Sequence, residues 1–302
     1  MIVGGTIMER LEKIFNEYTK PFLEEEQNKA GFIDKYHHSY FVRDESLLVD
    51  EMFTRYNPDF KMLLEIESLF HDIGRFEQLK LIGNFYDYDL VKKYPMIKDH
   101  GVLGAIIMKK VLLEKLFPEE RIFDDEIIKV IKLHTQNNNL LSLIRKEYIE
   151  IFKNYSLREI MFSSKTENEK TALTAINTTI IQDADRLDIF RKIVNQVWIP
   201  SATKDEISPQ IWNSFMNNNL PSINEIKRRG EWNPNVGHLV RLSFIEQMNL
   251  IPELQKIKDE NLLERIYQIS GNEIVRPAYD YMMERIEQII NQSEDKILVK
   301  RK

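Results

Sequence analysis

Residues 68–78, SLFHDIGRFEQ, place a histidine and an aspartate side by side where an apolar helical pattern ends. Burying two such side chains costs free energy unless hydrogen bonds or a bound cation compensate. Imidazole and carboxylate are natural ligands of divalent metal ions. His71 and Asp72 are therefore candidate metal ligands, although a single His-Asp dipeptide also occurs by chance.

Four more polar residues lie on apolar helical faces, each on a different segment of the chain. Each stands three or four residues from an apolar residue, so the side chains share one helical face. They are His38, His100, His134 and Asp185. The face of His38 is expected to include Leu48 and Val49, and the face of His100 is expected to run on to Val111.

A lone histidine on an apolar face is more often a hydrogen-bonded core residue than a metal ligand. Here four of the six histidines point inward together with two aspartates, and unpaired burial of so many polar groups would cost several kcal/mol. A divalent metal ion would compensate, and helical bundles build metal sites from facing helices. The pattern thus leaves both a metal site and a set of core histidines open.

The elements that would position these residues are helical almost throughout, which predicts an all-α fold. Ser208 followed by Pro209 marks a helix start. Four glycines are expected at helix ends or turns, namely Gly31, Gly74, Gly83 and Gly271. Prolines and polar residues near position 200 suggest two parts: a principal domain of residues 1–196 and a C-terminal helical extension, residues 197–302, packed on it.

The composition narrows the class of protein. Hydrophobic residues make up 43% and charged residues 30%, as in a soluble globular chain. The absence of cysteine excludes thiolate chemistry and favours a cytoplasmic location. The net charge of -6 disfavours nucleic acid as a partner. No apolar run approaches the roughly 18 residues of a membrane span. A homo-oligomer is left open.

The ordered motifs resemble the HD-domain superfamily of metal-dependent phosphohydrolases. HSYFV resembles the opening histidine motif, HDIGR the name-giving motif, and DHGVLGAIIM, VIKLH and QDADRLD the later ones. The resemblance covers roughly residues 36–190. It implies a helical HD-type bundle and the ligand set His38, His71, Asp72, His100, His134 and Asp185.

The resemblance also implies roles. Asp72 would bridge two ions, with His38, His71 and Asp185 at the first and His100 and His134 at the second. Asp72 and Arg75 are the expected catalytic residues, with Arg75 just beyond a helix end at Gly74, where it would contact phosphate. The expected cofactors are one or two divalent ions, from Mn, Fe, Ni, Co and Zn with Mg as a further candidate.

The expected reaction is hydrolysis of a phosphate ester or phosphodiester in a small phosphorylated molecule, a nucleotide first among them. The chain lacks the GYP segment of cyclic dinucleotide phosphodiesterases and the HPPFGH-type continuation of dNTP triphosphohydrolases, and Phe41 stands where the family usually has arginine. Two alternatives remain: a di-iron oxygenase of the same superfamily and a regulatory module that binds a nucleotide without turnover.

Other polar residues are ambiguous. Asp183, Arg186 and Asp188 would orient ligands or form a charge cluster. His37 and His238 are expected to be structural or exposed. Residues 224–235, NEIKRRGEWNPN, are expected to form a surface loop, with a phosphate-contacting lid as the alternative.

Overall fold

The computed structural model describes residues 4–54, 58–117, 121–136, 167–195, 203–293 and 297–299. Within these ranges the named elements are all helical, and the paired extended residues are those of one isolated bridge, Leu250 to Leu298. The predicted all-α fold is confirmed. Among the described helices, none combines the length and apolar composition that a membrane span requires.

The chain divides into two units, Met1–Gln182 and Asp183–Lys302, and the boundary falls inside one continuous helix, α11 (Glu167–Val194). The boundary expected from the sequence, between residues 196 and 197, lies within residues 196–202, which are outside the described residues. The two predicted domain ranges therefore stay a prediction.

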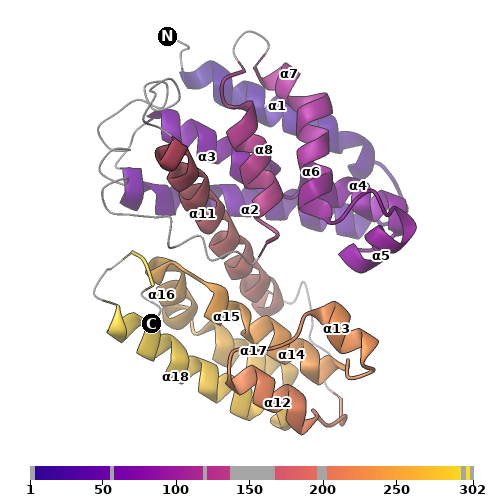
Figure 1. Cartoon of the computed structure of the whole chain (residues 1–302), viewed down its shortest axis with the longest axis vertical. Helices are drawn as coiled ribbons and strands as arrows, with labels where there is room; N and C mark the ends of the chain where they lie inside the picture. Colours follow the sequence, from indigo (N-terminus) through magenta and orange to yellow (C-terminus); the bar gives the residue numbers. More distant parts are fainter. Residues whose placement is uncertain are drawn as a thin grey trace. The chain divides into compact units, whose positions relative to one another are not determined.

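The first unit is a set of helices that precede α11, together with the first part of α11 itself (Figure 1). These are α1 (Gly4–Leu23), α2 (Lys29–Thr54), α3 (Pro58–Phe70), α4 (Ile73–Ile82), α5 (Asp87–Lys93), α6 (His100–Ile107), the π-helical turn η1 (Met108–Leu112), α7 (Leu113–Leu116) and α8 (Asp124–Leu133). Helix α2 packs on α3 and α4, α4 packs on α6, and α6 packs on α8. This chain of contacts brings the ends of α3, α6 and α8 toward α2.

The predicted glycine ends divide into two kinds. Gly83 and Gly271 follow α4 and α17 (Leu262–Ser270) with φ of 79° and 56°, a left-handed conformation that suits glycine, so they end helices as predicted. Gly31 and Gly74 lie in the first turns of α2 and α4, so they stand near helix starts, and no helix ends at either residue.

Close packing explains the two internal glycines. A Cβ atom on Gly74 would lie 2.1 Å from the carbonyl oxygen of His100, and one on Gly31 would lie 2.8 Å from Leu79 Cδ2. The neighbour of Gly74 is backbone, so α4 needs a residue without a side chain there, whereas the neighbour of Gly31 is the end of a leucine side chain. At Gly74 that neighbour is the helix that carries His100.

Two residues expected on buried faces are exposed. Val111 is 42% exposed because η1 winds the chain more widely, so that Leu112 and Leu113 are buried in its place. Leu48 is 57% exposed, whereas its neighbour Val49 is buried. Adjacent residues on a helix diverge by about 100°, and at this position Val49 is the one that faces the core.

The second unit contains the rest of α11 and the helices that follow. These are α12 (Pro209–Met216), α13 (Ile223–Arg228), α14 (Pro234–Leu242), α15 (Phe244–Gln247), α16 (Ile251–Asp259), α17, the 3₁₀ turn η3 (Glu273–Val275) and α18 (Arg276–Gln292). Helix α12 begins as predicted, because the Ser208 side chain accepts a hydrogen bond from the Ile211 amide and Pro209 occupies the first turn. Apolar residues from all of its α-helices form one core.

Candidate metal centre

Asp72 lies in the short turn between α3 and α4. Helix α3 ends at Phe70 and α4 begins at Ile73, so the helix does end at the His-Asp pair, but four residues earlier than Gly74. Asp72 occupies the N-cap position of α4, yet its side chain makes no capping hydrogen bond. Its two carboxylate oxygens are therefore directed to other partners.

Four buried histidines from different segments converge on this carboxylate. His38 comes from the middle of α2, His71 from the turn, His100 from the first position of α6, and His134 from the residue after α8. Adjacent imidazole rings in the series His38, His71, His134, His100 have centroids 5.1 Å apart. The sequence-predicted histidines thus form one continuous cluster.

The two oxygens of Asp72 face two different pairs of histidines. Oδ2 lies 3.5 Å from His38 Nε2 and 4.0 Å from His71 Nε2. Oδ1 lies 3.3 Å from His100 Nε2 and 3.6 Å from His134 Nε2. Each oxygen could therefore join one pair of imidazoles in holding an ion, and the carboxylate could bridge two ions.

The spacing within each pair fits a shared ion. The Nε2 atoms of His38 and His71 are 3.3 Å apart, and those of His100 and His134 are 3.2 Å apart. Two nitrogens that each bind one tetrahedral ion at about 2.0–2.1 Å lie about 3.3 Å from each other. His71, Asp72 and His134 also offer ligand atoms that all lie within 4.8 Å of one another.

The hydrogen bonds of Nδ1 in three of the rings determine that Nε2 is the nitrogen available to a metal. His71 Nδ1 donates to the carbonyl oxygen of Ser68 at 2.7 Å, and His134 Nδ1 donates to that of Ile131 at 2.6 Å. A carbonyl oxygen only accepts, so Nδ1 carries the proton and Nε2 keeps its lone pair. His100 Nδ1 lies 3.1 Å from Asp87 Oδ2, which favours the same tautomer.

The segment that carries this cluster matches a known protein family. Residues 36–189, about half of the chain, match the model of the HD domain. The chain belongs to the HD domain family. The predicted membership is confirmed, and the family is one of metal-dependent hydrolases that bind divalent ions. Searches of curated proteins and of solved structures gave no match.

Asp72 and the four histidines around it are called the HD site below. The electrostatics of this site favour the ionised form of the Asp72 carboxylate. Burial by itself raises the pKa of Asp72, but Lys35 and the surrounding imidazoles hold it well below its usual value. Burial also lowers the pKa of His100, with Arg75 acting in the same direction. A carboxylate anion and a neutral imidazole are the forms that bind a metal.

Two residues of this site were missed by the sequence analysis. Lys35 is buried on α2, with its Nζ 2.7 Å from Asp72 Oδ2. Asp87, at the start of α5, contacts both the ring and the backbone amide of His100. Lys35 had a detectable signal, since it precedes His38 by three residues on the same helical face. Asp87 comes from a loop-to-helix junction, where no periodicity marks the inward direction.

Arg75 lies beside Asp72, and its hydrogen bonds are made to other groups of the protein. Nη1 donates to the carbonyl oxygen of Phe85 and to Gln78 Oε1, both at 2.6 Å, and lies 3.5 Å from Asp87 Oδ1. Its Nε is 3.7 Å from Asp72 Oδ1, too far for a hydrogen bond. Arg75 thus ties α4 to the segment that carries Asp87, and its predicted contact with phosphate stays a prediction.

Asp185 lies half-buried on α11, in the second of the two units. Three residues earlier on the same helix, Gln182 Nε2 donates to the carbonyl oxygen of His134 at 3.0 Å. Residues three apart share a helical face, so Asp185 lies on the same face of α11 as Gln182. Its role as a metal ligand stays a prediction.

The polar neighbours of Asp185 within the second unit hold that unit together. Asp183 Oδ2 accepts hydrogen bonds from the backbone amides of Asn249 and Leu250. Arg186 donates to Asp183 Oδ1 and to the Gln247 carbonyl oxygen. These bonds anchor α11 to the start of α16, so both residues fix the course of the helix that carries Asp185.

The remaining histidines lie outside the Asp72 cluster. His37, next to His38, is exposed and its ring contacts Tyr36. His238 is buried in the second unit, with its Nδ1 2.8 Å from the hydroxyl oxygen of Tyr279. The expectation of a structural or exposed position fits both.

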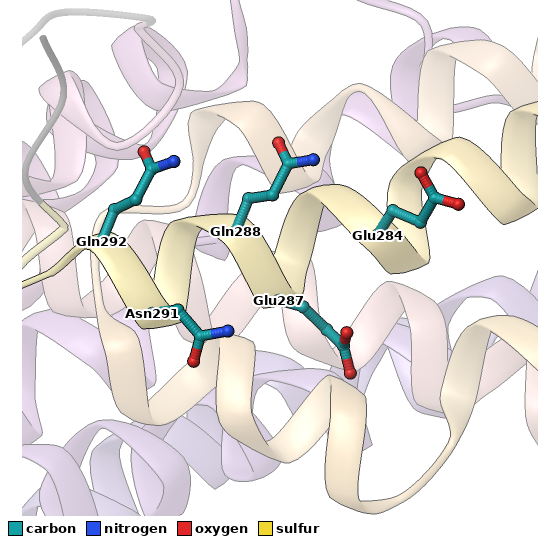
Figure 2. A pocket seen from close by; sticks show the side chains of 5 residues that line it. All are labelled: Glu284, Glu287, Gln288, Asn291 and Gln292. Carbon is teal, nitrogen blue, oxygen red and sulfur yellow. The ribbon is translucent and has the colours of Figure 1, made fainter.

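Residues 224–235 and a hollow on α18 offer no converging site. Trp232 is half-buried, with Lys227 Nζ 5.3 Å from its ring centroid, and Arg229 pairs with Glu225. The α18 hollow is lined by exposed side chains of that one helix, and Figure 2 shows them pointing to both sides of it. Neither place gathers ligands as the surroundings of Asp72 do.

Proposed function

We propose that this HD domain protein hydrolyses a phosphate ester or phosphodiester in a small molecule, with nucleotides as the first substrate class to test. The observation that carries the proposal is the convergence of four histidine Nε2 atoms on the two oxygens of Asp72. A divalent ion bound there would lower the pKa of a coordinated water and neutralise phosphoryl charge.

In this proposal Asp72 would hold one or two ions. His38 and His71 would be further ligands of the first ion, for which the sequence also predicts Asp185, and His100 and His134 would be those of the second. Ser68, Ile131 and Asp87 orient three of the rings through their Nδ1 atoms. Lys35 and Arg75 surround the carboxylate with positive charge, which an acidic protein of net charge -6 needs in order to attract a phosphate.

The deciding experiment combines metal analysis of the purified protein with a screen for phosphate release from nucleotides and other phosphoesters. We expect one or two Mn, Fe, Ni, Co or Zn ions per chain and turnover that stops on chelation. His38→Ala should lose metal and activity. His37→Ala is the matched control, because the adjacent ring lies outside the cluster, and it should keep both.

The outcome also separates the two alternatives, which use the same ligands. Bound iron with oxygen consumption and no phosphate release would favour an oxygenase, and nucleotide binding without turnover would favour a regulatory module. Either result would contradict the proposed hydrolysis.

A further inference from the structure

Lys35 is a buried cation at the centre of the HD site. It lies on α2 one turn before His38, and its side chain is 9% exposed. Its Nζ is 2.7 Å from Asp72 Oδ2, the same oxygen that faces His38 and His71. The ammonium group therefore lies within hydrogen-bond reach of the carboxylate that the proposed function assigns to both ions.

The ammonium has more hydrogen-bonding capacity than its neighbours use. A lysine ammonium carries three protons, and among the described residues its hydrogen bond is the one to Asp72. On another side it lies 5.4 Å from the ring centroid of Phe85, which supplies an attractive face without accepting a conventional hydrogen bond. Protons thus remain for an anion bound against Asp72.

The other cation of the site is committed differently. Arg75 Nη1 is already bound to the Phe85 carbonyl oxygen and to Gln78 Oε1, and it faces Asp87. Reorienting it toward a ligand would release the segment that positions Asp87 against His100. Lys35 needs no such rearrangement, because its bond to Asp72 uses one proton of three.

We infer that Lys35 is the residue that contacts a phosphate group bound at this site, and that Arg75 is a positioning residue that holds the segment carrying Asp87. This inference rests on the proposed function. It assigns the substrate-binding cation to α2, away from the HDIGR segment, and it makes the Lys35–Asp72 pair a link between the substrate phosphate and the metal-bridging carboxylate.

The test is a titration of inorganic phosphate into Mn²⁺-loaded full-length protein, followed by ³¹P relaxation, with Mn²⁺ content measured on the same samples. Lys35→Gln keeps a donor for Asp72 and removes the charge. We expect about 10- to 100-fold weaker phosphate binding, the range of a hydrogen bond to a charged group, with Mn²⁺ content unchanged. Lys35→Arg should restore part of the affinity.

Two further variants complete the comparison. Lys80→Met, which removes an exposed lysine of α4 whose Nζ lies over the Phe22 ring, should bind phosphate as the wild type does. Arg75→Met should lose less phosphate affinity than Lys35→Gln. Circular dichroism verifies that each variant is folded, and Lys35→Met serves as the second uncharged variant if the glutamine does not fold.

The inference is overturned if uncharged Lys35 variants bind phosphate within two-fold of the wild type, or if they also lose Mn²⁺, since Lys35 would then act through Asp72 alone. A larger loss in Arg75→Met would return the contact to Arg75. These results leave the wild type binding metal and phosphate. A wild type that binds neither would instead contradict the proposed function, and this inference with it.

Discussion

Two buried carboxylates, one in each unit, behave in opposite ways. Asp72 in the first unit is 3% exposed and Glu253 in the second is fully buried. Burial raises the pKa of both, yet Lys35 and the imidazoles bring the pKa of Asp72 well below its usual value. The pKa of Glu253 rises to about 8, through burial and then through the charge of Asp183.

The difference shows that neighbours decide whether a buried acid is ionised. Asp72 is surrounded by a cation and four imidazole rings, so it stays an anion that could hold a metal ion. Glu253 accepts one hydrogen bond from Lys256 at 3.0 Å and lies near another acid, so the proton is its better partner. We expect the first residue to serve function and the second to be structural.

The largest expected effect is at Asp72. Asp72→Ala should lower metal affinity and activity by more than about 100-fold. Loss of a residue that only hydrogen-bonds to a metal ligand already lowers them by about 10- to 100-fold. Its helical circular dichroism signal should persist, because the side chain makes no capping bond in α4. Elemental analysis with turnover measurements checks this. Undiminished metal content would show that Asp72, like Glu253, is structural.

An intermediate effect is expected at Asp87. Asp87→Ala removes the partner of His100 Nδ1, so metal affinity should fall by about 10- to 100-fold. Asp89→Ala on the same helix is the matched control, since Asp89 accepts from Asn84 at 3.3 Å, whereas the carboxylate that contacts His100 is that of Asp87. Competition with a metal-binding dye measures the metal affinity of both variants. If Asp87→Ala binds metal as tightly as Asp89→Ala does, Asp87 has no role in the site.

The smallest effect, on stability alone, is expected at Glu253. Between about pH 4.5 and pH 8 the folded protein holds a proton there that the unfolded chain releases, so stability falls as pH rises through this window. Glu253→Gln removes this dependence. It should stabilise the protein by roughly 1–3 kcal/mol at pH 8, less than the at most about 5 kcal/mol that the shift implies, because an amide is still buried.

Urea unfolding of wild type and Glu253→Gln at pH 4 and pH 8 measures this prediction. The stability difference should be absent at pH 4, where the acid is protonated in both states, and metal content should be the same in both proteins. A difference that does not change with pH would show that Glu253 keeps one protonation state on folding.

Helical periodicity in the sequence was enough to predict that the four histidines face inward, and the His-Asp pair at the end of an apolar pattern marked Asp72. The physical reason is that a helix repeats every 3.6 residues, so a polar residue in register with an apolar stripe must face inward. Local chemistry was also enough to start α12 at Ser208 and to end α4 at Gly83, because caps depend on adjacent backbone groups.

Contacts between distant segments decided the rest. Glycine is a residue type typical of helix ends, but the role of Gly74 is set by the carbonyl oxygen of His100, which would be 2.1 Å from a Cβ there. Lys35 shares a face with His38, but only the packing of α2 on α4 reveals that its charge meets Asp72. The sequence by itself determined that the four clustered histidines and Asp72 are buried. Only the tertiary structure decided which buried groups meet, because distances between helices depend on packing that no local pattern encodes.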